Sequence, residues 1–123
     1  MRGFGELESA VMERMWRADG ATTVRAVLEE LQQDRDIAYT TVMSTMDNLH
    51  RKRWLDREKH GKAFHYWPTL SREEYSARLM HEALEDAERP DIVLARFLEQ
   101  IPHDDSTRLN RVMRQWASGK DTP

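Results

Sequence analysis

The spacing of apolar residues changes once along the chain, near residue 54, and this change limits what the first part can fold into. Before it, apolar side chains recur at helical spacing in three separate stretches. After it, residues 55–59 and 63–67 alternate as short strands do, and Gly61 between them can adopt the positive φ of a tight turn. The pattern predicts three helices followed by one β-hairpin, which ends at Pro68.

Each of the three predicted helices has an apolar stripe with a recognisable boundary. Asp19 and Gly20 end the first helix, Thr22 or Thr23 can cap the second, and the third spans about residues 38–52. The stripes are, in order, Leu7, Ala10, Val11 and Met15; Val24, Val27, Leu28 and Leu31; and Val42, Thr45, Met46 and Leu49. Such stripes are typical of helices that pack one face against a shared core.

The remainder of the chain is predicted to be helical as well. Ser71 and Glu74 form a capping box at the start of a long helix. Pro90 is expected to end that helix, a short apolar helix is predicted over 92–101, and Pro102 separates it from a last helix. We therefore predict three regions: a first domain over residues 1–70, a helical region over 71–118, and a flexible tail over 119–123.

Composition excludes several classes of protein. The chain has no cysteine, which excludes a disulfide framework, thiol catalysis and metal sites built on thiolate. No apolar run is long enough to cross a membrane and no signal peptide precedes the first helix, so we expect a cytoplasmic protein. No nucleophile–base set, phosphate-binding glycine loop or metal-ligand spacing is present, so we expect no enzyme, no cofactor and no metal site.

The net charge of −3 hides a basic segment. Residues 1–70 contain 11 basic and 11 acidic side chains, whereas residues 71–123 contain 8 and 11. Residues 51–65 contain six lysines and arginines against two acidic residues, a local net charge of +4. This basic segment includes the end of the third predicted helix and the tip of the predicted hairpin, so a polyanionic partner is compatible with the acidic total.

Three helices and a hairpin with a basic tip follow the order of a winged helix-turn-helix domain. Hydroxyl and amide side chains on the exposed side of the third helix are of the types that read base edges in the major groove. Lysines at the hairpin tip and basic residues at the helix end would meet phosphates. The predicted DNA-binding residues are Thr40, Thr41, Ser44, Asn48, Arg51, Lys52, Arg53, Lys59, His60 and Lys62.

Asp47 lies on the same exposed side and would repel phosphate. It either pairs with Arg51 or accepts a hydrogen bond from a cytosine. The aromatic residues of the hairpin region are expected to serve the core and strand pairing rather than to stack on bases; they are Trp54, Phe64, Tyr66 and Trp67.

Two other functions are compatible with the same fold. His50, His60 and His65 could approach one another in a ligand- or metal-responsive regulator, although histidines that hold no metal are the more common outcome. The acidic excess and Asp47 would also fit a protein-interaction adaptor that does not bind DNA.

The helical region carries more apolar surface than so few residues can bury among themselves. We therefore predict that it interlocks with a second copy, rather than folding back on the first domain. The predicted dimerisation residues are Tyr75, Leu79, Ile92, Leu94, Phe97, Leu98, Ile101, Leu109, Val112, Met113 and Trp116. A twofold dimer would present two reading helices to half-sites one DNA turn apart, as a palindromic operator requires.

Residues 38–52 and 63–68, together with residues 7–12, Trp16 and residues 23–25, resemble the penicillinase-repressor (BlaI/MecI) family. The resemblance covers essentially the whole chain. It implies a dimeric winged-helix repressor of antibiotic-resistance operons whose helical C-terminal part forms the dimer. It also implies a membrane-bound sensor protease as a partner that triggers cleavage in this part.

Several residues depart from the pattern of the family. Asn48 stands where the family commonly has arginine, and Arg53 where it has glycine, so Arg53 would be strained if its backbone were left-handed. The bond that the protease cleaves in resistance repressors corresponds to Arg96–Phe97, with arginine in place of asparagine. The cysteine cluster of the family's copper-responsive branch is missing, which excludes copper sensing by that route.

Overall fold

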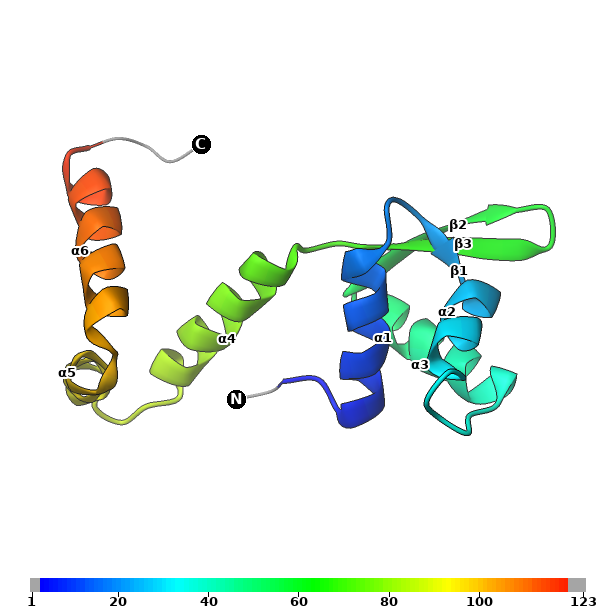
Figure 1. The fold of residues 1–123 in the computed structure, drawn as a ribbon, viewed down its shortest axis with the longest axis horizontal. Coiled ribbons are helices and arrows are strands. Elements are labelled where there is room, and N and C mark those ends of the chain that lie inside the picture. The colour runs from blue at the N-terminus through cyan, green and yellow to red at the C-terminus, as the bar shows by residue number, and fades with distance from the viewer. Residues whose placement is uncertain (1–2, 120–123) are drawn as a thin grey trace. The chain divides into compact units, whose positions relative to one another are not determined.

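The computed structural model describes residues 3–119, which form six helices and one small sheet (Figure 1). Its contacts divide the chain into two units, with the boundary between Glu82 and Ala83, inside α4. The elements are α1 (Glu6–Arg17), β1 (Thr22–Thr23), α2 (Val24–Leu31), α3 (Tyr39–Arg51), β2 (Leu55–His60), β3 (Ala63–Pro68), α4 (Arg72–Glu85), α5 (Pro90–Gln100) and α6 (His103–Ala117). The mainly helical fold with a small hairpin is therefore confirmed.

The predicted boundary signals are present as side-chain and backbone interactions. The Thr23 hydroxyl accepts a hydrogen bond from the Ala26 amide at 3.1 Å and caps α2. At the start of α4, the Glu74 amide donates to Ser71 Oγ at 3.0 Å, and the Ser71 amide donates to Glu74 Oε1 at 2.8 Å. Gly61 has φ 64°, as the tight turn between β2 and β3 requires.

Two local predictions need correction. Pro90 does not stand outside a helix that begins at residue 92: it is the first residue of α5, because the missing amide of proline costs nothing in a first turn. The sheet has three strands rather than two, in the order β1-β3-β2. Thr22 pairs with Tyr66 and Thr23 with His65, and a two-residue strand is too short to produce an alternating pattern.

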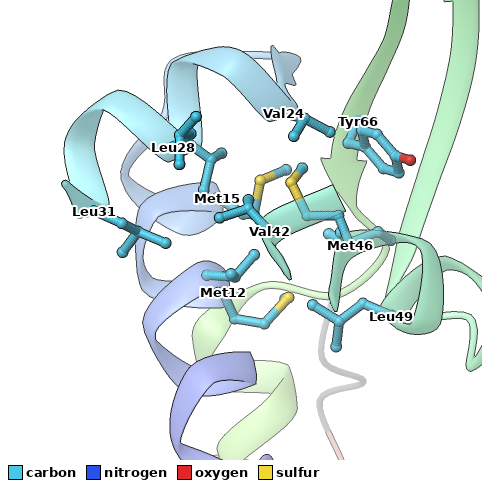
Figure 2. Packing of buried hydrophobic residues seen from close by; sticks show 12 residues of the cluster. Met12, Met15, Val24, Leu28, Leu31, Val42, Met46, Leu49 and Tyr66 are labelled. Atoms are coloured by element: carbon cyan, nitrogen blue, oxygen red, sulfur yellow. The ribbon is translucent and has the colours of Figure 1, made fainter. Parts of the chain in front are cut away.

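The core of the first unit lies where the three helices meet the sheet (Figure 2). The predicted stripes of α2 and α3 are buried, and α1 adds Met12 to Val11 and Met15. Leu55 from β2 and Tyr66 from β3 close the core on the sheet side, with 1% and 2% of their surface exposed. The cluster contains Val11, Met12, Met15, Val24, Val27, Leu28, Leu31, Val42, Met46, Leu49, Leu55 and Tyr66.

The end of α3 contains the one left-handed non-glycine residue among residues 3–119. Arg53 has φ 71°. Its amide donates to the His50 carbonyl at 2.9 Å, and the Trp54 amide donates to the Leu49 carbonyl at 2.9 Å. This pair of hydrogen bonds is a Schellman motif, which turns the chain sharply from α3 into β2. The strain expected for Arg53 is therefore present, because a side chain at positive φ costs about 1–2 kcal/mol.

We expect Arg53→Gly to raise the free energy of unfolding by about 1 kcal/mol, since glycine adopts a positive φ without that cost. The measurement is urea denaturation followed by circular dichroism. Arg53→Ala is the matched control, because it also removes the long side chain but keeps a Cβ at the left-handed position. Equal midpoints for the two variants would contradict this explanation.

An aromatic cluster fastens the start of α4 to the rest of the first unit. The Tyr75 ring stacks on Phe4 with centroids 4.2 Å apart, and lies 5.5 Å from Trp16 and 5.6 Å from Trp54. The Phe4 amide donates to the Tyr75 hydroxyl at 3.0 Å. Tyr75 therefore has partners within its own chain, and its predicted role in dimerisation stays a prediction.

The second unit buries little of its apolar surface. No residue of α5 or α6 is buried, although α5 carries an almost continuous apolar sequence. Phe97 is 42% exposed and Trp116 67% exposed. The other large exposed apolar side chains here are Ile92, Val93, Leu94, Leu98, Val112 and Met113. Among the tail residues 119–123, only Gly119 lies within the described part of the chain.

Candidate nucleic-acid interface

All ten predicted DNA-binding residues are exposed, and they come from α3, the turn that follows it and the hairpin. On α3, Thr40, Ser44 and Asn48 follow one another at intervals of four residues, so they form a row along one side of the helix. Thr45 points the other way: it is 9% exposed and its hydroxyl donates to the Thr41 carbonyl at 2.9 Å. The hydroxyl and amide row is thus separate from the packed side of α3.

The basic residues of the hairpin gather at its turn. Lys59 and His60 end β2, and Lys62 lies in the turn before β3. The register pairs Lys59 with Phe64 and His60 with Ala63, so the side chains of both strands near the turn lie close together. His60 Nε2 lies 3.7 Å from Glu58 Oε1, which directs this imidazole toward its neighbour on β2.

Arg57 joins the hairpin to the exposed side of α3. Its Nη1 atom donates to Asp47 Oδ1 at 3.0 Å and to the Tyr66 hydroxyl at 3.1 Å, and its guanidinium carbon lies 4.1 Å from the Phe64 ring centroid. The hydrogen bonds to Tyr66 and Asp47 raise the pKa of Arg57 above its ordinary value. The contact places the hairpin beside the row on α3, so one surface contains both.

Asp47 makes ion pairs with two arginines. Besides Arg57, it faces Arg51, whose Nε atom lies 3.3 Å from Asp47 Oδ2. Of the two alternatives for Asp47, pairing with Arg51 is therefore present in the unbound chain. Two guanidinium groups beside one carboxylate leave this part of the surface positive, which removes the repulsion expected of Asp47 toward phosphate.

Two other predicted DNA-binding residues, Asn48 and Lys52, already interact with side chains of the same chain. Arg51 Nη2 donates to the Asn48 side-chain oxygen. The Lys52 ammonium lies 2.9 Å from Glu8 Oε2, and this hydrogen bond lowers the pKa of Glu8. Lys52 therefore ties the end of α3 to α1, whereas Arg53 has no ion pair among the described residues and stays exposed.

Met43, Arg57 and Phe64 belong to this surface but were absent from the predicted set. Met43 and Phe64 are 42% and 36% exposed. Met43 could have been found from the sequence, because it precedes Asp47 by one helical turn on the same side of α3. Phe64 was expected to serve strand pairing and the core: it pairs with Lys59 across the hairpin, but its side chain lies outside the core. From the sequence alone, Arg57 is one more charged surface residue, because only the fold shows that it bonds to Asp47.

The three histidines proposed as a metal-responsive site do not form one cluster. The His60 and His65 rings lie 4.7 Å apart on the hairpin, while His50 lies on α3. Nδ1 of His50 and of His65 is buried without a hydrogen-bond partner. Within residues 3–119, no group of three histidine, aspartate or glutamate side chains has an arrangement that could hold a metal ion.

The sequence profile of the penicillinase repressor family matches residues 4–115. The chain belongs to this family. The resemblance inferred from residues 38–52 and 63–68 is thereby confirmed. Two relatives, both named transcriptional regulator BlaI, come from the CDC 1551 / Oshkosh and ATCC 25618 / H37Rv strains of Mycobacterium tuberculosis. Each is 36% identical over 118 residues, which cover 94% of this chain and 86% of the relative.

A solved structure agrees with the family in its fold. The solution structure of the DNA binding domain of the repressor BlaI superposes with a TM-score of 0.53 at 23% identity, covering 61% of this chain and 94% of that domain. The winged-helix part of the predicted fold is thereby confirmed. Penicillinase repressors are transcriptional regulators, which are not a class of enzyme. None of the helices over residues 3–119 is long and apolar enough to span a membrane.

We expect Asp47 and Arg57 to be energetically coupled by roughly 0.5 kcal/mol, because both side chains are partly exposed and solvent screens their attraction. The measurement is a double-mutant cycle of Asp47→Asn and Arg57→Gln on the free energy of unfolding in urea. A cycle on Glu13 and Arg17, whose charged atoms are 4.0 Å apart on α1, is the control and should give a coupling close to zero. Equal couplings in the two cycles would contradict a specific role for Arg57.

Proposed function

We propose that the chain is a transcriptional repressor that binds a palindromic operator as a homodimer. The observation that carries the proposal is the common surface of α3 and the hairpin, where a hydroxyl and amide row lies beside a basic turn, joined through Arg57 and Asp47. Family membership supports the same function, since the relatives are named transcriptional regulators. By analogy with the resistance repressors, the regulated genes would respond to antibiotics.

The residues proposed to bind DNA fall into two chemical groups, with hydroxyl and amide side chains in one and basic side chains in the other. Thr40, Thr41, Ser44 and Asn48 are short donors and acceptors on a helix that fits the major groove, so they would discriminate among base edges. Lys59, His60 and Lys62 would meet the phosphates beside the groove, and Arg51 and Arg53 those at the end of α3. Lys52 would contribute less, because its ammonium is already paired with Glu8.

We expect the chain to enrich a palindromic sequence from a pool of random duplexes. Replacing both Lys59 and Lys62 with alanine should then weaken binding to every duplex alike and lower the slope of log affinity against log salt by about 1 for each phosphate that is no longer neutralised. Fluorescence anisotropy at several salt concentrations measures both quantities. Arg111→Ala, an exposed cation on α6, is the control and should leave the slope unchanged. A slope unaffected by the lysine variants would contradict the phosphate role of the hairpin.

The dimer is proposed from the apolar surface of the second unit. Two helices without a buried side chain cannot repay the entropy of ordering their backbone, so another apolar surface has to cover them. A second copy of the same surface is self-complementary under a twofold axis. We propose that Ile92, Leu94, Phe97, Leu98, Ile101, Leu109, Val112, Met113 and Trp116 form this interface, with Leu79 from α4.

We expect Phe97→Glu combined with Leu98→Glu to produce monomers, because each charge would have to be buried without a partner in the interface. Analytical ultracentrifugation gives the mass in solution, and anisotropy with the selected duplex gives the affinity. Operator binding should fall by at least tenfold, since a monomer loses the linkage between half-sites. Gln100→Glu on the same helix is the matched control. Unchanged tight binding by a proven monomer would contradict the proposal.

A membrane-bound sensor protease is the remaining proposed partner, with the repressor itself in the cytoplasm. The bond that would correspond to the cleavage site, Arg96–Phe97, lies inside α5. Backbone in a helix does not fit the extended conformation that a protease active site requires, so α5 would have to unfold locally before cleavage. Both side chains are exposed, which makes the segment reachable once it opens.

A further inference from the structure

The surface proposed to contact DNA also carries large apolar side chains. Tyr39 is 40% exposed, Met43 42% and Phe64 36%. Two adjoining hollows, of about 360 and 290 Å³, share Met43, Phe64 and Tyr66 among their lining residues. Apolar side chains that remain exposed as a group mark a surface that contacts something else. The surrounding row of hydroxyls and amides does not explain why they are here.

The smaller hollow lies between α3 and the hairpin. Met43, Ser44 and Asp47 line it from α3, and Arg57, Phe64 and Tyr66 line it from β2 and β3. We call this hollow the helix–hairpin notch. Arg57 fixes its width, because this one side chain bonds to Asp47 on the helix while its guanidinium covers the Phe64 ring.

The apolar walls are bordered by positive charge. The Arg57 guanidinium lies 4.1 Å and the Lys59 ammonium 5.8 Å from the Phe64 ring centroid. Arg25 lies over the Tyr39 ring at 5.1 Å, and it lines the larger hollow together with Lys62. Asp47, the acidic residue of the notch, is paired with Arg51 and Arg57. The occupant that fits is therefore a polyanion with an apolar group between its charges.

Duplex DNA presents such an arrangement in the major groove. The 5-methyl group of thymine is the apolar feature of the base edges there, and phosphates line both sides of the groove. We infer that the helix–hairpin notch receives the 5-methyl group of a thymine, and that Met43 is the specificity-determining residue that contacts it. This inference rests on the proposed function. Phe64 forms the opposite wall, and Arg57 is a positioning residue that holds this wall in place.

Methionine suits the task because its flexible, polarisable side chain adapts to the shape of a methyl group without imposing a hydrogen-bond pattern. Ser44, one position further along α3, would contact the polar edge of the same or the adjacent base pair. Burial of one methyl group corresponds to about fourfold in affinity. The notch would thus distinguish thymine from cytosine at one position of each half-site.

The test uses the full chain and the duplex that it selects from a random pool. Each thymine of that duplex is replaced in turn with deoxyuridine, which removes the 5-methyl group and keeps every hydrogen-bonding atom. We expect about fourfold weaker binding for one thymine in each half-site. For Met43→Ala and Met43→Gln, the same replacement should have no effect. Met80→Ala, which removes a 60% exposed methionine from α4, should retain the full penalty.

The outcomes separate this inference from the proposed function. If the wild-type chain enriches no duplex, both are overturned. If it binds its duplex but no thymine is sensitive, or if both Met43 variants keep the wild-type penalty, only the inference is overturned. Circular dichroism and the urea midpoint check that the variants fold. We expect them to fold because Met43 is exposed and its replacement leaves the core unchanged. A penalty that disappears in both Met43 variants and persists in Met80→Ala supports the inference.

Discussion

The position of Tyr66 determines how α3 and the hairpin are arranged. Its ring is buried in the core of the first unit, beside Val24 and Met46, so the centre of β3 cannot move without opening the core (Figure 2). Its hydroxyl leaves the core and accepts a hydrogen bond from Arg57, which holds Asp47 on α3. The packing that stabilises the first unit therefore also sets the geometry of its exposed surface. A phenol serves here because one end is apolar and the other can pair.

Much of the first unit could be predicted because its local and global preferences agree. The stripes on α2 and α3, the cap at Thr23 and the turn at Gly61 each indicate the same arrangement that the packing requires. The exposed residues of α3 followed from helical periodicity alone. The residues that were missed depend on contacts distant in sequence: Arg57 is ten positions from Asp47, and no pattern within β2 indicates that pairing.

The structure was harder to predict from the sequence where a residue fits two structural roles equally well. Pro90 fits either the end of one helix or the first turn of the next, and only the course of the chain decides. Tyr75 has helical spacing with Leu79, which predicts a dimer contact, and helical spacing alone does not reveal that its ring also stacks on Phe4. The partner comes from the first residues of the described chain, which carry no periodic signal. An apolar stripe shows that a surface is covered, but not by which segment.

The lack of burial in α5 and α6 has a consequence for how the chain melts. α5 and α6 contain no fully buried side chain, so under the proposed dimer the folded population of this unit would depend on the concentration of the chain. The first unit has a buried core of its own, formed by α1, α2, α3 and the sheet. Under the same proposal a single transition temperature would not describe the chain, because unfolding of the second unit would depend on protein concentration and unfolding of the first would not.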